Sequence, residues 1–308
     1  MRNTFINTLT ELAEQDSRII LLTGDLGFMV LENFIQKNPK RFINVGVAEQ
    51  NMVGIATGMA EAGFIPFVYS IVNFATLRPY EFIRNGPIMH QLPVRIVGVG
   101  GGLEYSNNGV THYGLEDVGI MRVQNGIQVI APADAQQTRS ALLDTWNMAQ
   151  PIYYRLGKDD KTIVPGLEGH FDGNKVELIR PGKDVLILAM GNIVMEAVEA
   201  AQVLSGQGIE CAVAVVSSLN PGPVGHLADL LSHFPLTYTL EAHFTSGGLG
   251  SLVSEVIAEH SDIKTRLIRL GVRSVPDGVS GSQKFLYRKY GISSDAVVDS
   301  ILSEQKGL

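Results

Sequence analysis

Glu49 is an acidic residue in an unusual position, because it stands between two segments that carry almost no charge. A short apolar run, residues 42–47, precedes it. Small and apolar residues then recur at helical spacing: Met52, Ile55, Ala56, Met59 and Ala60. We therefore expect a helix that begins at Glu49 and ends near Gly63. A carboxylate gains only modestly from the first turn of a helix, and burying one is costly. Glu49 either caps and solubilises its helix or has a chemical role such as proton transfer.

His112 lies in a long loop, residues 98–114, that is rich in glycine and asparagine. The loop follows a predicted strand, where α/β proteins often carry functional residues. It is not a dinucleotide-binding fingerprint, because Leu103 replaces the third required glycine and loop-forming residues follow where a helix should begin. The pattern leaves three interpretations of His112 open: a surface residue, a brace for the loop, or a group that moves protons.

Two further charged residues follow predicted strands. Asp25 comes directly after the apolar run RIILLTG, and Arg155 stands at the end of PIYYRL. The carboxyl ends of parallel strands are where open α/β sheets bind ligands, so both residues are candidates for a site. Each also has a simpler interpretation. Asp25 could cap a helix that starts near Met29, and Arg155 could form a surface salt bridge.

The predicted elements alternate between strand and helix, which favours an α/β fold. We expect two domains, each a mostly parallel sheet flanked by helices. The first domain is placed at residues 1–157 and the second at 183–308. A segment with charges, glycines and two prolines, residues 158–182, is expected to be the linker. We also expect one helix over about residues 77–90 and one continuous strand over residues 209–219.

Composition limits the class of protein. The 308 residues suffice for two domains with their own cores, and 45% of them are hydrophobic. The net charge of -7, without a basic run, argues against nucleic acid as a main partner. No apolar run approaches a membrane span of roughly 20 residues, and the N-terminal segment is spaced as a helix face, not as a signal peptide. We expect a cytoplasmic protein.

The single cysteine, Cys211, excludes an internal disulfide and is expected to pack in a core.

The stretch NVGVAEQNMVGIATGMAEAG, followed by PFVYSIVNF, resembles the pyrimidine-binding domain of thiamine diphosphate enzymes of the transketolase group. The resemblance implies that Glu49 contacts N1' of the cofactor's aminopyrimidine and that Phe74 stacks on this ring. A carboxyl group that donates to N1' favours the imino form of the ring, which can then activate the reactive carbon of the thiazolium. We expect Asp25 at the same cofactor site.

The segment NGVTH resembles the DGxTH loop of transketolases and deoxyxylulose phosphate synthases. This implies that His112 lines the substrate channel and handles protons at substrate oxygens. Asn108 stands where those families have an acid, and an amide can hydrogen-bond a hydroxyl but cannot take its proton at neutral pH. Arg155 matches an arginine that holds substrate phosphate. Gly100 and Met29 stand where sugar-phosphate transketolases have a phosphate-binding histidine and serine, which weakens the case for ordinary pentose phosphates.

The chain lacks the GDG sequence with which this group holds a metal-bound diphosphate. The resemblance therefore implies that this chain is half of an enzyme. The C-terminal part of this chain resembles the C-terminal domain of transketolase. A separate subunit, resembling the N-terminal part of transketolase, is expected to bind the thiamine diphosphate through Mg²⁺, or Ca²⁺ or Mn²⁺. We expect a heterotetramer in which this chain forms a homodimer, and no metal site in this chain.

The function expected is ketol transfer from a ketose to an aldehyde, by a chain that is active only with its partner. Three alternatives remain open at this stage. One is a deoxyxylulose phosphate synthase type of reaction, which releases carbon dioxide. Another is the beta subunit of a 2-oxo acid dehydrogenase, which passes its acyl group to a lipoyl domain. The third is a binding or regulatory module that kept the fold.

Overall fold

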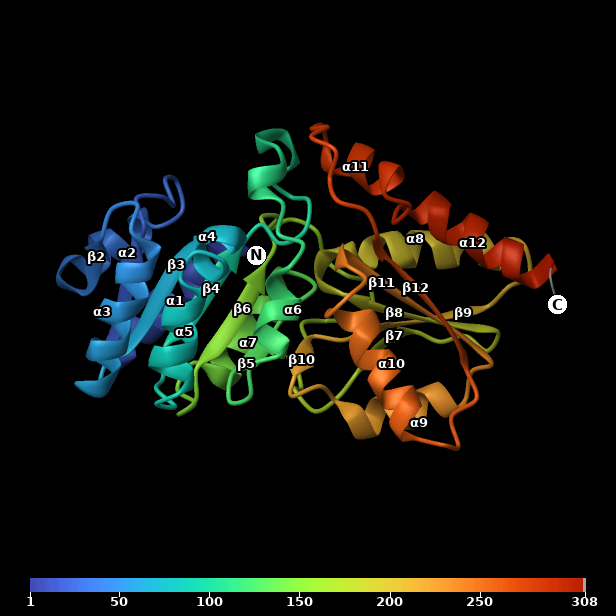
Figure 1. The fold of residues 1–308 in the computed structure, drawn as a ribbon, viewed down its shortest axis with the longest axis horizontal. Helices are drawn as coiled ribbons and strands as arrows, with labels where there is room; N and C mark the ends of the chain where they lie inside the picture. The colour runs from blue at the N-terminus through green and yellow to red at the C-terminus, as the bar shows by residue number, and fades with distance from the viewer. Residues whose placement is uncertain (307–308) are drawn as a thin grey trace.

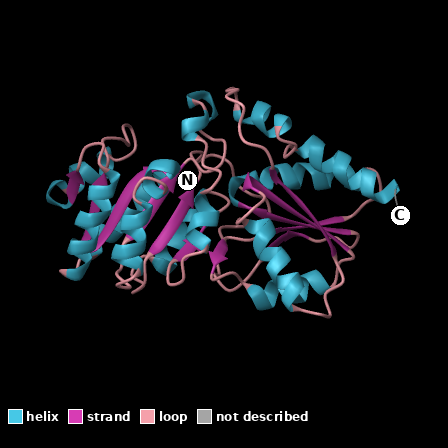
Figure 2. Cartoon of the chain, in the orientation of Figure 1, coloured by secondary structure: helices cyan, strands magenta, loops and turns pink. Residues whose placement is uncertain are grey.

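The structure of the protein is a computed structural model that describes residues 1–306. It consists of two sheets with helices on their faces (Figures 1 and 2). The seven-stranded sheet has the order β10-β5-β6-β4-β3-β1-β2. Its strands are β1 (Ile19–Thr23), β2 (Phe42–Asn44), β3 (Ile65–Ile71), β4 (Arg95–Val99), β5 (Gln128–Ile130), β6 (Ile152–Leu156) and β10 (Ser218–Asn220). All neighbours in it are parallel except β10 and β5. The α/β prediction is confirmed.

The five-stranded sheet has the order β12-β11-β8-β9-β7, and only β7 runs antiparallel to its neighbour. Its strands are β7 (Glu177–Arg180), β8 (Val185–Met190), β9 (Cys211–Val215), β11 (Leu236–Phe244) and β12 (Arg266–Val272). Strand β7 lies inside the predicted linker, residues 158–182. The proposed domain limits, 1–157 and 183–308, therefore remain a prediction, and residues 307–308 lie outside the described residues.

The helices divide between the faces of the sheets. Phe5, Phe34 and Leu142 pack on one face of the first sheet, and they belong to α1 (Arg2–Gln15), α2 (Glu32–Lys37) and α7 (Ala135–Thr145). The opposite face is covered by residues of α3 (Glu49–Glu61), α5 (Tyr80–Ile83) and α6 (Asp117–Arg122). The remaining helices are α4 (Val72–Thr76), α8 (Val194–Ser205), α9 (Val224–Ser232), α10 (Leu249–Glu259), α11 (Gln283–Lys289) and α12 (Ser294–Lys306). None of the helices in residues 1–306 is both long and apolar enough to span a membrane.

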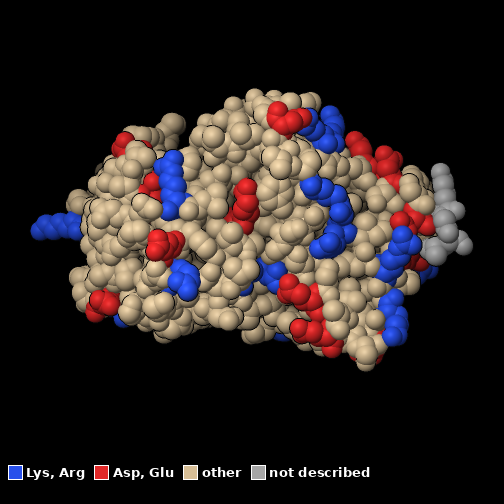
Figure 3. Space-filling view, viewed as in Figure 1, with Lys and Arg blue, Asp and Glu red and all other residues tan. Residues whose placement is uncertain are grey.

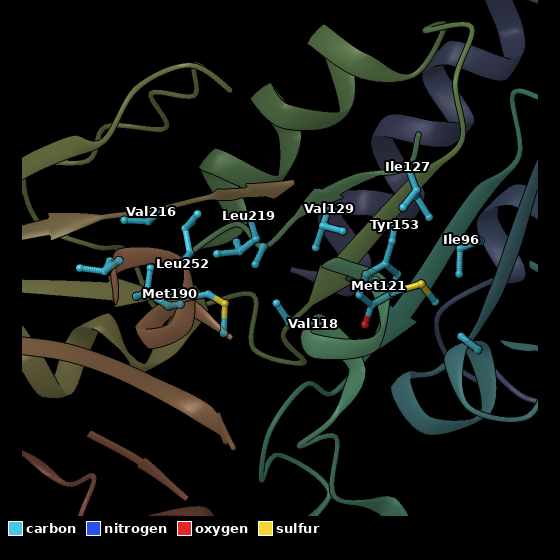
Figure 4. Close-up of a cluster of buried hydrophobic side chains, with 14 of the residues drawn as sticks. Ile96, Val118, Met121, Ile127, Val129, Tyr153, Met190, Val216, Leu219 and Leu252 are labelled. Atoms are coloured by element: carbon cyan, nitrogen blue, oxygen red, sulfur yellow. The ribbon is translucent and has the colours of Figure 1, made fainter. Parts of the chain in front are cut away.

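One hydrophobic cluster runs through both sheets (Figure 4). Val118, Val129 and Tyr153 come from the first sheet and its helices, whereas Met190 and Leu252 come from the second. Side chains alternate between the two faces of a strand, so Ile20 and Leu22 enter this cluster while Ile19 and Leu21 face α1. On the surface, acidic and basic side chains are interspersed over the face drawn in Figure 3.

Three sequence predictions are corrected by the structure. The predicted helix over residues 77–90 is instead the short α5 followed by a wide helical turn, Arg84–Ile88. Pro87 lies inside that turn and has no N–H to donate, which explains the irregular hydrogen bonding. The helix expected near Met29 begins at Glu32. The strand expected over residues 209–219 splits into β9 and β10, because β10 leaves the second sheet and pairs with β5 of the first.

Arg155 joins the two halves and is itself held by a buried ion pair with Asp117. Nε of Arg155 donates to Oδ2 of Asp117 at 2.8 Å, and Nη2 donates to the carbonyl oxygens of Gly114 and Ala242 at 3.0 and 2.9 Å. The Tyr153 hydroxyl also donates to Asp117, at 2.7 Å, and burial followed by the charge of Asp117 raises the pKa of Tyr153 well above its usual value. Because Ala242 lies on β11, Arg155 fixes the first sheet against the second.

We predict that Asp117→Ala destabilises the chain strongly, because it leaves the buried Arg155 without its ionic partner. The expected loss is about 3–5 kcal/mol, measured by urea denaturation. Asp172→Ala is the matched control, since Asp172 pairs with Lys175 at an exposed site and should cost at most about 1 kcal/mol. Equal losses in the two variants would contradict this account of the junction.

We also predict that stability falls as the pH rises from about 4.5 to 7, with Glu104 as the cause. Burial raises the pKa of Glu104 from 4.5 to about 7, although its carboxylate accepts from the Lys158 amide and from Asn192. The folded chain thus holds a proton that the unfolded chain releases, and folding loses about 1–3 kcal/mol across that window. Glu104→Gln should flatten the pH profile of the urea midpoint, whereas Glu259→Gln, an exposed change, should not. An unchanged profile in Glu104→Gln would refute the assignment.

Candidate functional site

Glu49 begins α3, as predicted, and its side chain is only 2% exposed. The helix starts abruptly because Gly46 has a φ of +74°, a conformation that favours glycine, and lets the chain turn from β2 into α3. Gly24, just after β1, lies behind the carboxylate, since a Cβ there would sit 3.4 Å from Oε1 of Glu49. The Glu49 side chain is therefore not a solvated cap. It is an acid enclosed at the carboxyl edge of the first sheet.

Asp25 lies beside this edge and is tied to β2. Its amide donates to Oδ1 of Asn44 at 3.0 Å, and Nδ2 of Asn44 donates back to Asp25 Oδ1 at 3.1 Å. Oδ1 of Asn44 also accepts from the amide of Gly46 at 3.0 Å. Asn44 thus holds the turn after β1 against the turn before α3. Asp25 does not cap α2, whose N-cap residue is Leu31.

Phe74 and Arg78 complete the surroundings of Glu49. Phe74 lies on α4, and the guanidinium carbon of Arg78 lies 4.0 Å from the centroid of its ring. Nη1 of Arg78 donates to both carboxylate oxygens of Glu49, at 3.1 and 3.0 Å. One planar cation therefore stacks on the aromatic ring and pairs with the acid.

His112 approaches the same aromatic ring from the glycine-rich loop, which is found in Figure 1 by its colour near residue 105. The His112 and Phe74 ring centroids lie 5.3 Å apart, nearly edge to face. The loop is held by the buried Asn73, whose Nδ2 donates to the carbonyl oxygens of Thr111 and Tyr113 at 3.1 and 2.8 Å. The structure thus brings Glu49, Phe74 and His112 together, although they stand far apart in sequence.

Asn108 and Arg155 occupy different environments. Asn108 is exposed at the end of the helical turn Ser106–Asn108 in the His112 loop. Arg155 is 6% exposed and its Nε and Nη2 are engaged by Asp117, Gly114 and Ala242, so it is a buried residue of the domain junction and not a surface salt bridge. Its predicted contact with substrate phosphate stays a prediction.

The site opens into a cleft of ≈ 630 Å³. The cleft is lined by Val47, Ala48, Glu49, Gln50, Asn51 and Arg78. Large apolar side chains are exposed in the segments that precede α2 and α3, with Met29 at 90% and Val47 at 70%. Within residues 1–306, no group of three or more His, Cys, Asp or Glu side chains is arranged to hold a metal ion.

Two residues of the site escaped the sequence analysis. Arg78 carried a signal, because it is the first charged residue after Glu61 and stands one helical turn beyond Phe74. Asn73 carried a weaker one, as a polar residue directly after an apolar strand. Arg78 contacts Glu49, which is 29 positions away in the sequence, and Asn73 contacts Thr111, which is 38 positions away. Such contacts cannot be read from local spacing.

Comparisons with known proteins match both halves of the chain. Residues 1–161 match the family described as "Transketolase, pyrimidine binding domain", and residues 174–297 match "Transketolase, C-terminal domain". A 6-deoxy-6-sulfo-D-fructose transketolase subunit of a Clostridium species is 35% identical, covering 97% of this chain and 92% of that protein. A subunit of the apulose-4-phosphate transketolase of Phocaeicola vulgatus is 31% identical, with 98% of this chain and 96% of that protein covered.

A solved structure, described as a split gene transketolase in an inactive beta4 tetramer, has the same fold. Its TM-score is 0.86 and its sequence identity is 33%, and the match covers 98% of this chain and 96% of that one. The likeness thus extends over both sheets and includes the region of Glu49, Phe74 and His112.

We predict that Asn73→Ala loosens the His112 loop, because it removes both hydrogen bonds that tie the loop to α4. The amides of residues 109–113 should exchange with deuterium at least about fivefold faster, as expected from losing on the order of 1 kcal/mol of local stability. Asn85→Ala, a change at an exposed asparagine, is the control and should leave these amides unaffected. Unchanged exchange in Asn73→Ala would show that other contacts hold the loop.

Proposed function

Because the chain belongs to the transketolase family, we propose that it is one subunit of a two-component, thiamine diphosphate-dependent transketolase. The enzyme transfers a two-carbon ketol unit from a ketose to an aldehyde. The names of the relatives support this, because the Clostridium and Phocaeicola proteins are themselves transketolase subunits and are matched over more than nine tenths of their length. The arrangement around Glu49 is the observation that carries the proposal.

The residues around Glu49 fit an aminopyrimidine ring. A planar nitrogen-bearing group, the guanidinium of Arg78, already stacks on Phe74 and donates to both oxygens of Glu49. An aminopyrimidine is also planar and also presents nitrogen atoms at its edge, so Phe74 can stack on its face while Glu49 binds N1'. Burial of Glu49 keeps water from competing for this hydrogen bond.

Bound thiamine diphosphate supplies the carbon nucleophile that cleaves the ketose and carries the two-carbon unit. Glu49 donates a proton to N1' and so holds the ring in the form that activates this carbon. Phe74 fixes the plane of the ring. The turn that Asn44 holds between Asp25 and Gly46 keeps the floor of the site rigid, and Asp25 is proposed to contact the cofactor there.

His112 and Asn108 act on the substrate. The His112 ring lies beside that of Phe74, and from there it is proposed to reach oxygens of a substrate bound above Phe74. The Thr111 hydroxyl lies 3.0 Å from His112 Nδ1. When Thr111 donates to Nδ1, the imidazole N–H is on Nε2 and can donate a hydrogen bond to a substrate oxygen. Asn108, exposed on the same loop, hydrogen-bonds a substrate hydroxyl without exchanging a proton with it.

The diphosphate and its divalent metal, Mg²⁺ or a similar ion, are held by a second subunit that resembles the N-terminal part of transketolase. The Clostridium and Phocaeicola relatives, which are named as transketolase subunits, support that division. The partner covers the cleft at Glu49, and the exposed Phe28, Met29 and Val47 are suited to burial in such an interface. Two copies of each subunit form a heterotetramer around a homodimer of this chain, and the chain alone is inactive.

We predict that Glu49→Ala, assembled with the partner subunit, lowers the rate of ketol transfer at least about 100-fold, because the proton donor to N1' is lost. The rate is measured from the appearance of the transferred product, with circular dichroism to verify the fold. Glu61→Ala is the control, since Glu61 is an exposed acid at the other end of the same helix. Full activity in Glu49→Ala would refute the proposed chemistry.

A further inference from the structure

Arg78 occupies the place at which the proposed cofactor ring would bind. Its guanidinium carbon is 4.0 Å from the centroid of Phe74, and its Nη1 lies 3.1 and 3.0 Å from the two oxygens of Glu49. The stacking face and the acid that are proposed to bind the aminopyrimidine are thus both engaged by one side chain. The inference that follows rests on the proposed function.

The contact with Arg78 and the contact with the ring exclude each other. A guanidinium and a pyrimidine ring cannot both stack on the same face of Phe74 at van der Waals distance. Glu49 likewise cannot pair with Arg78 and bind N1' at the same time. A carboxyl group that donates to N1' carries a proton, and a protonated carboxyl group no longer forms an ion pair with arginine. Arg78 must therefore leave before Glu49 can act.

Arg78 is able to leave. Its side chain is 45% exposed, whereas that of Glu49 is 2% exposed. Arg78 lies between α4 and α5, just before Pro79, and it lines the open cleft. Its long side chain can therefore rotate from the cleft toward solvent. A cofactor can displace Arg78 because its ring offers Glu49 a hydrogen bond in exchange for the ion pair.

We propose that the Arg78 side chain occupies the aminopyrimidine-binding position in the chain without cofactor. It closes the site in that state and is displaced when the cofactor binds. In the uncomplexed chain it neutralises a buried carboxylate that has no other ionic partner among residues 1–306, and it covers the face of Phe74. The cost of displacing Arg78 is subtracted from the affinity for the cofactor.

Calorimetric titration of the assembled enzyme with thiamine diphosphate and magnesium tests this proposal. Arg78→Gln should bind the cofactor about three- to tenfold more tightly than the wild type, because no cation has to be displaced from Glu49 and Phe74. Arg78→Lys should fall between them, since it keeps the charge but lacks the planar group that stacks on Phe74. Arg84→Gln is the control and should bind the cofactor as the wild type does, because the exposed Arg84 side chain hydrogen-bonds the neighbouring Asn85 and not Glu49.

Weaker or unchanged binding by Arg78→Gln, with a wild type that binds, would overturn the role of Arg78 and leave the proposed function standing. A wild-type complex that binds no cofactor would overturn both. A double-mutant cycle in the chain alone, with Arg78→Gln and Glu49→Gln and urea unfolding as the readout, tests the contact separately. The proposal predicts a favourable coupling between the two residues. Strict additivity would mean that Arg78 does not occupy the site.

Discussion

The burial of the Glu49 carboxylate is the constraint on which the candidate site depends. An acid enclosed at the edge of a parallel sheet is stable only if another group compensates for the water that it loses. In this chain the compensation comes from Arg78, which is held at the right distance by α4 and by its stacking on Phe74. In the proposed function the cofactor ring replaces Arg78 as the compensating group, because it offers Glu49 a hydrogen bond in place of the ion pair.

This exchange needs a rigid floor and a movable cover. The floor is the carboxyl edge of the seven-stranded sheet, where Asn44 bonds the turns on either side and Gly24 lets the chain pass close behind Glu49. The cover consists of Arg78 and the His112 loop, and both are partly exposed. Arg155, which is held by Asp117, connects the first sheet to β11, so the second sheet braces the first.

Much of this arrangement was accessible from the sequence. The apolar runs around Glu49 predicted a strand, a helix beginning at that residue and a second strand, and the structure contains β2, α3 and β3 there. Motif resemblance then connected Glu49 with Phe74 and His112. Two kinds of feature were missed for physical reasons. Arg78 and Asn73 act through long-range contacts, and β10 pairs with a strand from the other half of the chain. Arg155 was placed at a strand end correctly, but only the packed structure reveals the buried Asp117 that binds it.

If this chain supplies the aminopyrimidine half of a site that a second subunit completes, cofactor binding must require both subunits. The most direct test is to titrate thiamine diphosphate and magnesium by calorimetry into three samples. They are the chain alone, its complex with an N-terminal transketolase-like subunit from the same organism, and the same complex with Glu49→Ala. We expect stoichiometric binding to the wild-type complex, none to the chain alone, and a large loss of affinity with Glu49→Ala. A complex that forms and takes up no cofactor, or one in which Glu49→Ala binds as well as the wild type, would contradict it.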